Sequence, residues 1–311
     1  MALPLRFGML APQVVPYPVQ QERWRELDDY GFDSLWLADH FVNPNRPAGR
    51  WFESHTLMAA AAAQTERIRI GALVTSITFR HPAHLAKEVL TLDHISNGRI
   101  EMGIGAAGAP NDYGMTGLPA WEPLERARRF RDFVKMLDAL LRSDATDGGG
   151  TSYAGKYYQA TEAELDPGPV QLPRPPFTLA AARPVNMKFT ARHADSWNTI
   201  PSDQFDDRGP LSSEECVDQT RARNEQMDEF CTAVGRDPST LRRSILAGGG
   251  VTPDNVWGSL EQFRDFVGRY IEVGVDEFLF YYPSRVEQGD RAYERIAREV
   301  IPELKAEFAA Q

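Results

Sequence analysis

The stretch from Ile68 to Gly105 constrains the fold most strongly, because it has the pattern of a strand, a helix and a second strand. A β-branched run ends in Arg-His-Pro, and a segment with helical periodicity follows it. Asn97-Gly98 ends that segment, and a second apolar run leads to a glycine. Parallel strands need a crossover of a dozen or more residues, which Pro82–Asn97 supplies. The unit predicts a parallel α/β fold with its active site beyond the strand ends.

The same alternation of short apolar runs and helical segments continues along the chain and predicts eight strands, each followed by a helix. The expected strands are Leu5–Ala11, Ser34–Ala38, Ile68–Ile77, Ile100–Ile104, Phe177–Ala182, Ser196–Ile200, Arg243–Ala247 and Glu277–Tyr282. The expected helices are Gln20–Tyr30, His55–Gln64, Ala83–Ile95, Glu122–Arg142, Met187–His193, Glu215–Ala233, Leu260–Val273 and Ala292–Phe308. Sequential βα repetition predicts an α/β fold of the closed (β/α)8 TIM-barrel type, with residues 1–311 as one domain. An open doubly wound sheet is the alternative, but no G-x-G-x-x-G follows the first strand.

Two segments interrupt this rhythm. Residues 143–176 contain three glycines, three tyrosines and a proline-rich run, and we expect an insertion with a small hairpin after the fourth helix. Residues 201–214 form a polar stretch after the sixth strand. Because barrels place mobile covers in the loops that follow their strands, we expect a lid there.

Composition narrows the choice of partners. The formal net charge is −10, and no basic tract is present, so neither nucleic acid nor an anionic membrane surface is an expected partner. No apolar run approaches the length of a membrane span, and the chain opens without a signal-peptide pattern. Cys216 and Cys231 would lie roughly 22 Å apart on one helix, too far for a disulfide. We therefore expect reduced thiols and a cytoplasmic protein.

Residues at the carboxyl ends of barrel strands face the active site. Here they are low in charge and rich in small and aromatic residues, which suits a large, flat, partly apolar ligand. His40 ends the second strand, and a histidine there can act as a general acid or base. Asp39 is expected to orient a neighbour or to bind backbone amides. Glu53 is either a second site residue or a favourable partner of a helix dipole. Thr75 lies at the end of the third strand.

The residues that join the fifth strand to its helix offer an anion site, because open backbone amides at a helix N-terminus bind phosphate. This segment is Ala182, Arg183, Pro184, Val185 and Asn186, and Lys188 and Arg192 add positive charge. No metal site is expected: His81 and His84 have a usable spacing, but no third ligand is evident.

The chain resembles the bacterial luciferase-like superfamily along nearly its whole length. The resemblance rests on SLWLADHF, IRIGALVTSITFRHP, LDHISNGRIEMGIG, YYQATEAELDPGPVQ and ARHADSWNT. This superfamily has a (β/α)8 barrel with insertions and uses reduced flavins or the deazaflavin coenzyme F420. The sequence of these segments is most similar to that of the F420-dependent branch.

The resemblance assigns roles to several positions. His40 matches the site histidine of that branch, and the Leu73-Val74 bond matches a non-prolyl cis peptide behind the cofactor ring. Ala106, Ala107 and Asn111 match loop positions that contact the ring and its side chain, and Ala182–Asn186 matches the phosphate loop. Two departures stand out: Gly108 replaces a glutamate acid found in sugar-phosphate dehydrogenases, and Arg183 replaces a glycine of the phosphate loop.

Three functions remain open at this point. The first is hydride transfer between coenzyme F420 and a small organic substrate, with His40 moving the proton. The second is an FMN-dependent monooxygenase supplied with reduced flavin by a separate reductase, and the third is a non-catalytic flavin-binding barrel. We also expect a homodimer. The substrate does not follow from the sequence.

Overall fold

The computed structural model describes residues 3–142, 149–201, 210–283 and 292–310. Within these residues, eight parallel strands form a closed barrel in the order β1-β2-β3-β4-β7-β8-β9-β10. These strands are β1 (Arg6–Leu10), β2 (Ser34–Leu37), β3 (Arg69–Ser76), β4 (Ile100–Gly105), β7 (Phe177–Ala180), β8 (Ser196–Thr199), β9 (Arg242–Ala247) and β10 (Glu277–Tyr281). The predicted (β/α)8 barrel is confirmed.

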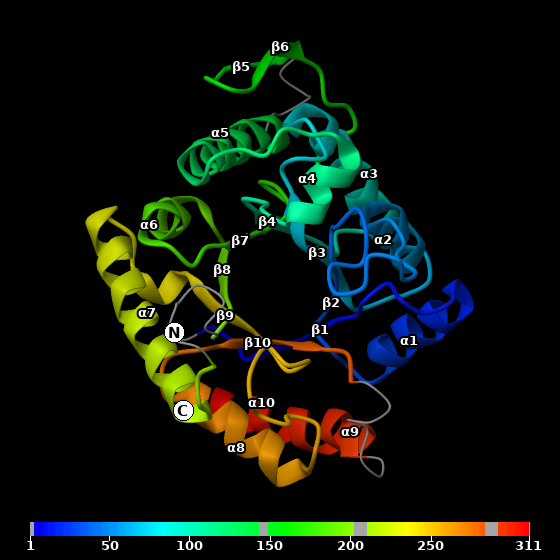
Figure 1. Ribbon diagram of the computed structural model, residues 1–311, viewed down its shortest axis with the longest axis vertical. Helices are drawn as coiled ribbons and strands as arrows, with labels where there is room; N and C mark the ends of the chain where they lie inside the picture. Colours follow the sequence, from blue (N-terminus) through cyan, green and yellow to red (C-terminus); the bar gives the residue numbers. More distant parts are fainter. Residues whose placement is uncertain (1–2, 143–148, 202–209, 284–291, 311) are drawn as a thin grey trace. The chain divides into compact units, whose positions relative to one another are not determined.

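Each predicted helix is present with its ends shifted by a few residues, although the last one is divided in two, and the described residues hold one further helix, α4 (Pro110–Thr116) (Figure 1). The predicted helices are α1 (Tyr17–Asp29), α2 (Ser54–Ala62), α3 (Pro82–Ser96), α5 (Pro123–Leu141), α6 (Pro184–His193), α7 (Ser213–Ala233), α8 (Leu260–Ile271), α9 (Ala292–Arg295) and α10 (Ile301–Ala309). A π-helical turn, Ile296–Val300, joins the last two. Proline occupies the first turn of α3, α5 and α6, where its missing N–H removes no helical hydrogen bond. None of the helices in the described residues is long and apolar enough to span a membrane.

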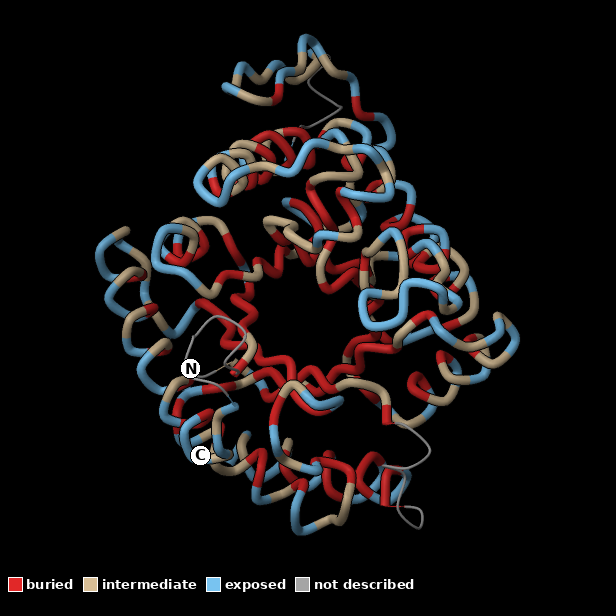
Figure 2. Tube along the Cα trace, viewed as in Figure 1, coloured by how far each residue is buried: buried red, intermediate tan, exposed pale blue. Residues whose placement is uncertain are grey.

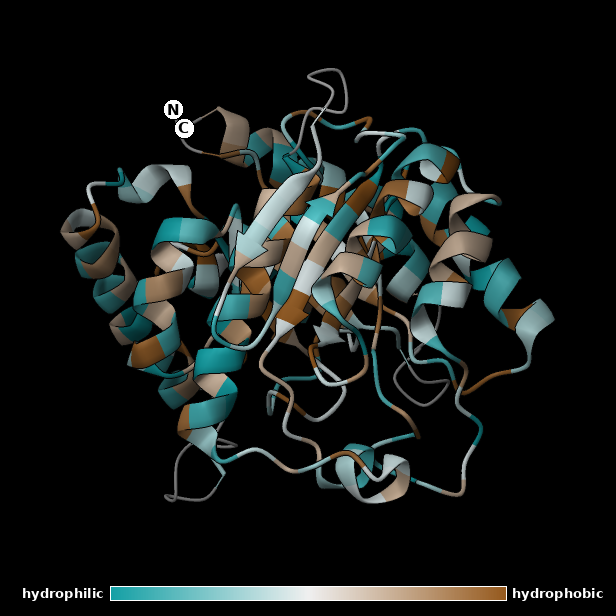
Figure 3. Ribbon diagram, turned by 90° about the horizontal axis from the view of Figure 1, so that it is seen from above, coloured by the Kyte–Doolittle hydropathy of each residue, from teal (hydrophilic) through white to brown (hydrophobic). Residues whose placement is uncertain are grey.

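The chain divides into two compact units. The described residues within 1–11, 26–35 and 179–311 make up the first unit. Its interior is aromatic: Phe7 of β1 stacks on Phe278 of β10, and Phe263 of α8 packs against Phe280. Apolar residues recur along α8 at the spacing of one helix face, so α8 buries that face. Figure 3 shows hydrophilic and hydrophobic residues side by side along the helices.

The second unit comprises residues 12–25 and 36–178. Here Trp36 of β2 is fully buried against Gly71 of β3 and Gly103 of β4. A Cβ at Gly71 would lie 2.5 Å from the Trp36 ring, so only glycine allows this approach. Asn97 ends α3 with a left-handed φ of 54°, as the Asn-Gly signal predicts. The barrel strands are buried along most of their length, whereas the helices expose one side (Figure 2).

The insertion also belongs to the second unit. It holds the predicted small hairpin, formed by β5 (Thr151–Ala154) and β6 (Gln159–Ala163). Asp132 of α5 anchors this hairpin, because its carboxylate accepts hydrogen bonds from the Tyr153 hydroxyl at 2.7 Å and the Tyr157 amide at 2.6 Å. Residues 143–148 of the insertion lie outside the described residues, as do residues 202–209, on which most of the expected lid falls.

Candidate active site

His40 follows β2, at the carboxyl end of the strand as predicted. Its Nδ1 lies 2.9 Å from Oδ2 of Asp112, and the second oxygen of that carboxylate accepts the Phe41 amide at 2.9 Å. The indole of Trp51 donates to the His40 carbonyl at 3.0 Å, which fixes the backbone of the same residue. The imidazole is 31% exposed, whereas the Asp112 side chain is buried. The His40 ring is therefore fixed by Asp112 but remains accessible to solvent.

Asp112 belongs to a helix that the sequence analysis missed, α4 (Pro110–Thr116). Pro110 starts this helix, and Gly117 ends it with a φ of 69°. Asn111 consequently lies in the first turn of α4, so the expectation that it occupies a loop position is wrong. The proline and the glycine that bound the segment were signals that could have revealed the helix.

Asp39 binds a backbone amide and orients its neighbours, as predicted. Its carboxylate accepts hydrogen bonds from the Ser76 amide at 2.9 Å and the Ser54 hydroxyl at 2.7 Å, and it pairs with Arg80 at 2.7 Å. Buried Gln13 also holds this segment, because its side-chain amide donates to the Ala38 carbonyl and accepts from the Ala38 amide. These contacts hold the ends of β2 and β3 in fixed positions.

Arg80 is the centre of an ion-pair network that the sequence analysis did not identify. Besides Asp39, its guanidinium pairs with Glu53 at 2.5 Å and with Glu88 at 3.1 Å. Glu53 caps α2 by accepting the amides of residues 55 and 56. Burial raises the pKa of Glu53, but the Thr56 hydrogen bonds and the Arg80 charge outweigh it and leave this pKa below its usual value. The observed contacts of Glu53 are thus those of a helix cap and ion-pair partner.

His55 lies behind this network and is buried. Burial, followed by the positive charge of Arg80, lowers its pKa to about 4. Its ring faces the Ser54 hydroxyl at 3.1 Å and the Thr75 hydroxyl at 3.4 Å. Ligand atoms of Asp39, Glu53 and His55 lie within 4.8 Å of one another, close enough for a metal ion. The Arg80 guanidinium already bonds to both carboxylates of this group, and its charge repels a second cation.

The Leu73-Val74 peptide bond is cis, as predicted. The pairing of β3 with β4 shifts its register between Ala72 and Thr75, which marks a bulge at the same place. After β4, Ala107 has a φ of 60° and Gly108 a φ of 142°. An alanine rarely adopts this left-handed conformation, and such outliers concentrate at functional sites.

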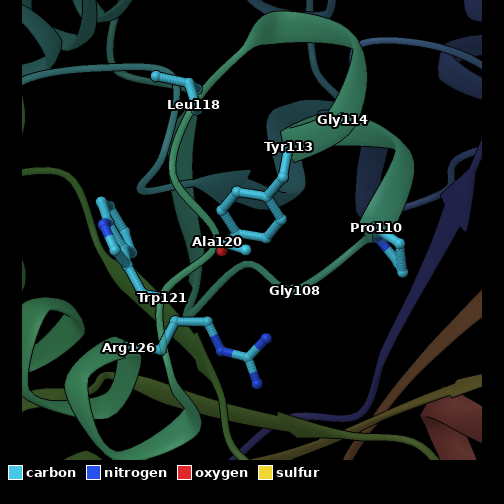
Figure 4. A pocket seen from close by; sticks show the side chains of 8 residues that line it. All are labelled: Gly108, Pro110, Tyr113, Gly114, Leu118, Ala120, Trp121 and Arg126. Atoms are coloured by element: carbon cyan, nitrogen blue, oxygen red, sulfur yellow. The ribbon is translucent and has the colours of Figure 1, made fainter.

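A pocket of about 430 Å³ opens beside this loop (Figure 4). Its walls are formed by α4 and by the segment that leads to α5, and Arg126 and the aromatic rings of Tyr113 and Trp121 line it. The two rings meet edge to face at 6.4 Å. The pocket offers aromatic surface with one cationic side chain.

In the first unit, α6 begins directly after β7 at the predicted anion site. Arg183 is its N-cap residue and provides no side-chain cap. The amide of Asn186 donates to the Arg183 carbonyl. The expectation that this amide is open for an anion is therefore wrong. The side-chain oxygen of Asn186 is buried and accepts no hydrogen bond from the described residues.

Comparison with known proteins identifies the class. The family description "luciferase-like monooxygenase" matches residues 3–248, and the chain therefore belongs to this family. It is 32% identical over 185 residues to an F420-dependent glucose-6-phosphate dehydrogenase of Amycolatopsis mediterranei, covering 59% of this chain and 52% of that one. The chain thus spans about half the length of this relative.

Solved structures show the same fold. An F420-dependent secondary alcohol dehydrogenase matches with a TM-score of 0.78 and 18% identity, covering 96% of this chain and 100% of that chain. A monooxygenase, RslO1 from Streptomyces bottropensis, matches with a TM-score of 0.75 and 20% identity, covering 96% and 100%.

Proposed function

We propose that this chain is an F420-dependent oxidoreductase that transfers hydride between the deazaflavin and a small organic substrate. The observation that carries the proposal is an accessible histidine, held by a carboxylate, at the carboxyl end of β2 in a family with F420-dependent members. Barrel enzymes place their catalytic groups at this end of their strands.

The residues present fit such a cofactor. The bulge at Leu73-Val74 and the small residues Ala106 and Ala107 provide a surface low in charge, which suits a flat ring. Within the first unit, the exposed side chains of Arg183 and Lys188 and the backbone at Val185 in the first turn of α6 suit a phosphate group. When bound, the deazaflavin would supply the hydride chemistry.

In this proposal the protein supplies orientation and proton transfer. His40 receives the substrate proton during oxidation, or returns it during reduction, through the Nε2 atom that faces away from Asp112. Asp39 and Arg80 hold the strand ends on which this histidine stands. Leu73, Val74 and Thr75 would lie behind the deazaflavin ring, and Asn111 of α4 would contact the side chain of the cofactor.

The matching family description also favours a second function, an FMN-dependent monooxygenase that uses reduced flavin and oxygen. Fluorescence titration with F420 and FMN, each oxidised and reduced, separates the two. Preferential binding of F420 and turnover without oxygen would support the deazaflavin enzyme. Tight binding of FMN and a requirement for oxygen would refute it, and binding without turnover of any acceptor would favour a flavin-binding protein without activity.

Gly108 argues against a sugar-phosphate substrate. The residue has a φ of 142°, which a glutamate rarely adopts, and a Cβ there would lie 2.5 Å from the Arg126 guanidinium. We therefore propose that the carboxylic acid of sugar-phosphate dehydrogenases has no equivalent here. Glucose 6-phosphate should not reduce F420 in the presence of this protein, and steady reduction would contradict the assignment.

A further inference from the structure

The contacts of Asp112 determine which nitrogen of His40 carries a proton. An ionised carboxylate only accepts hydrogen bonds, so the 2.9 Å contact to Nδ1 requires that nitrogen to be the donor. In the neutral ring the proton then sits on Nδ1, and Nε2 keeps its lone pair. Nε2 makes no hydrogen bond within the described part of the chain, and the ring is 31% exposed.

The backbone fixes the orientation of the Asp112 carboxylate. Its Oδ1 accepts the Phe41 amide at 2.9 Å, and that amide belongs to the residue next to His40. One carboxylate therefore holds both the ring and the main chain at the end of β2. Trp51 completes this arrangement by donating to the His40 carbonyl.

We propose that Asp112 is a positioning residue, which holds neutral His40 in the Nδ1–H tautomer so that Nε2 can accept the substrate proton. The inference deepens the proposed function and rests on it. The imidazole is 31% exposed whereas the Asp112 side chain is buried, so we place the ring and not the carboxylate next to the substrate.

The same geometry makes Asp112→Asn a sharp test. The Phe41 amide should keep the amide oxygen of the asparagine at the Oδ1 position, because that position must accept a hydrogen bond. The NH2 group then replaces Oδ2 and donates to Nδ1 of His40. This forces the ring into the Nε2–H tautomer without removing either side chain. In the serine protease triad, the corresponding exchange gives the wrong tautomer and lowers kcat by about 10⁴-fold.

The tautomer can be measured without a known substrate. ¹⁵N-histidine labelling and long-range ¹H–¹⁵N NMR at alkaline pH distinguish the two neutral forms, and His40→Gln assigns the signals. In the unaltered protein, Nδ1 of His40 should show the shift of a protonated nitrogen, and in Asp112→Asn that of an unprotonated one. Glu88→Gln is the matched control, since Glu88 pairs with Arg80 and makes no contact with His40.

Cofactor titration separates the inference from the proposed function. Asp112→Asn should bind F420 within a few-fold of the unaltered protein, and its turnover should fall by about 100-fold or more. With the signals assigned by His40→Gln, an Nε2–H tautomer in the unaltered protein would overturn the inference even if Asp112→Asn does not fold. So would an unchanged tautomer in an Asp112→Asn protein that binds F420. If neither F420 nor FMN binds, the proposed function is wrong, and the catalytic purpose of the tautomer is refuted with it.

Discussion

Replacement of His55 tests the electrostatics of the Arg80 network through stability. The pKa of a histidine is ordinarily about 6.5, and burial together with the Arg80 charge lowers that of His55 to about 4 in the folded protein. Between these values the unfolded chain binds a proton that the folded chain does not, so the free energy of unfolding must fall as the pH falls. Above pH 6.5 the ring is neutral in both states, and its contribution is fully present.

The expected magnitude follows from the separation of the two pKa values. The pKa of His55 is about 2.5 lower in the folded chain than in the unfolded chain, which corresponds to roughly 3 kcal/mol of the free energy of unfolding. About 2 kcal/mol of this is lost between pH 7.5 and pH 5. His55→Gln has no charge to gain, so this part of the pH dependence should disappear from the variant. The absolute stability of the variant also changes through lost packing, which makes the slope against pH the informative quantity.

The assay is urea unfolding at pH 7.5, 6 and 5, followed by fluorescence. His84→Gln is the control, because the His84 side chain is 74% exposed and makes its ion pair at the surface. Its curve should run parallel to that of the unaltered protein. If the His55→Gln curve also runs parallel, His55 is not held neutral by its surroundings, and the description of the network is wrong.

Further predictions concern both units. Burial raises the pKa of Asp276 to about 7 despite the nearby Arg242, so between about pH 4 and pH 7 the folded chain holds a proton that the unfolded chain has released, and the free energy of unfolding falls as the pH rises through this range. Asp276→Asn should therefore gain stability relative to the unaltered protein as the pH rises from 4 to 8, by at most about 4 kcal/mol, and urea titrations at the two pH values check this. His40→Ala should lower turnover by about 100-fold or more with any substrate that reduces F420, while cofactor affinity changes much less; a collapse of affinity with turnover intact would make His40 a binding residue. Arg183→Glu should weaken F420 binding by about 2 kcal/mol in fluorescence titration, through loss of a charge-assisted contact, and an unchanged affinity would place the phosphate elsewhere.

The barrel could be predicted because each strand and helix carries its own signal. Asn97-Gly98 marks the end of α3, and the spacing of Phe130, Phe133 and Leu137 marks the buried face of α5. The cis peptide followed from the family resemblance and not from local pattern. The expected homodimer, the single-domain boundary and the cofactor contacts stay predictions.

Side-chain partners could not be predicted in the same way. His40 could be predicted as a site residue because its position at the end of a strand is visible in the local sequence. Its partner Asp112 lies 72 residues away on a seven-residue helix that went unrecognised. Arg80 likewise pairs with carboxylates of three different segments, and one arginine in a sequence gives no sign of this. Such partnerships appear only when the elements are placed together.

The acids near the site are held by other groups of the protein. Asp39, Glu53 and Glu88 all lie near the ends of β2 and β3, but each pairs with the Arg80 guanidinium. The Asp112 carboxylate is occupied by the His40 ring and a backbone amide. These contacts engage each of the four carboxylates with groups of the protein. We infer that these acids order the site and leave the proton chemistry to His40.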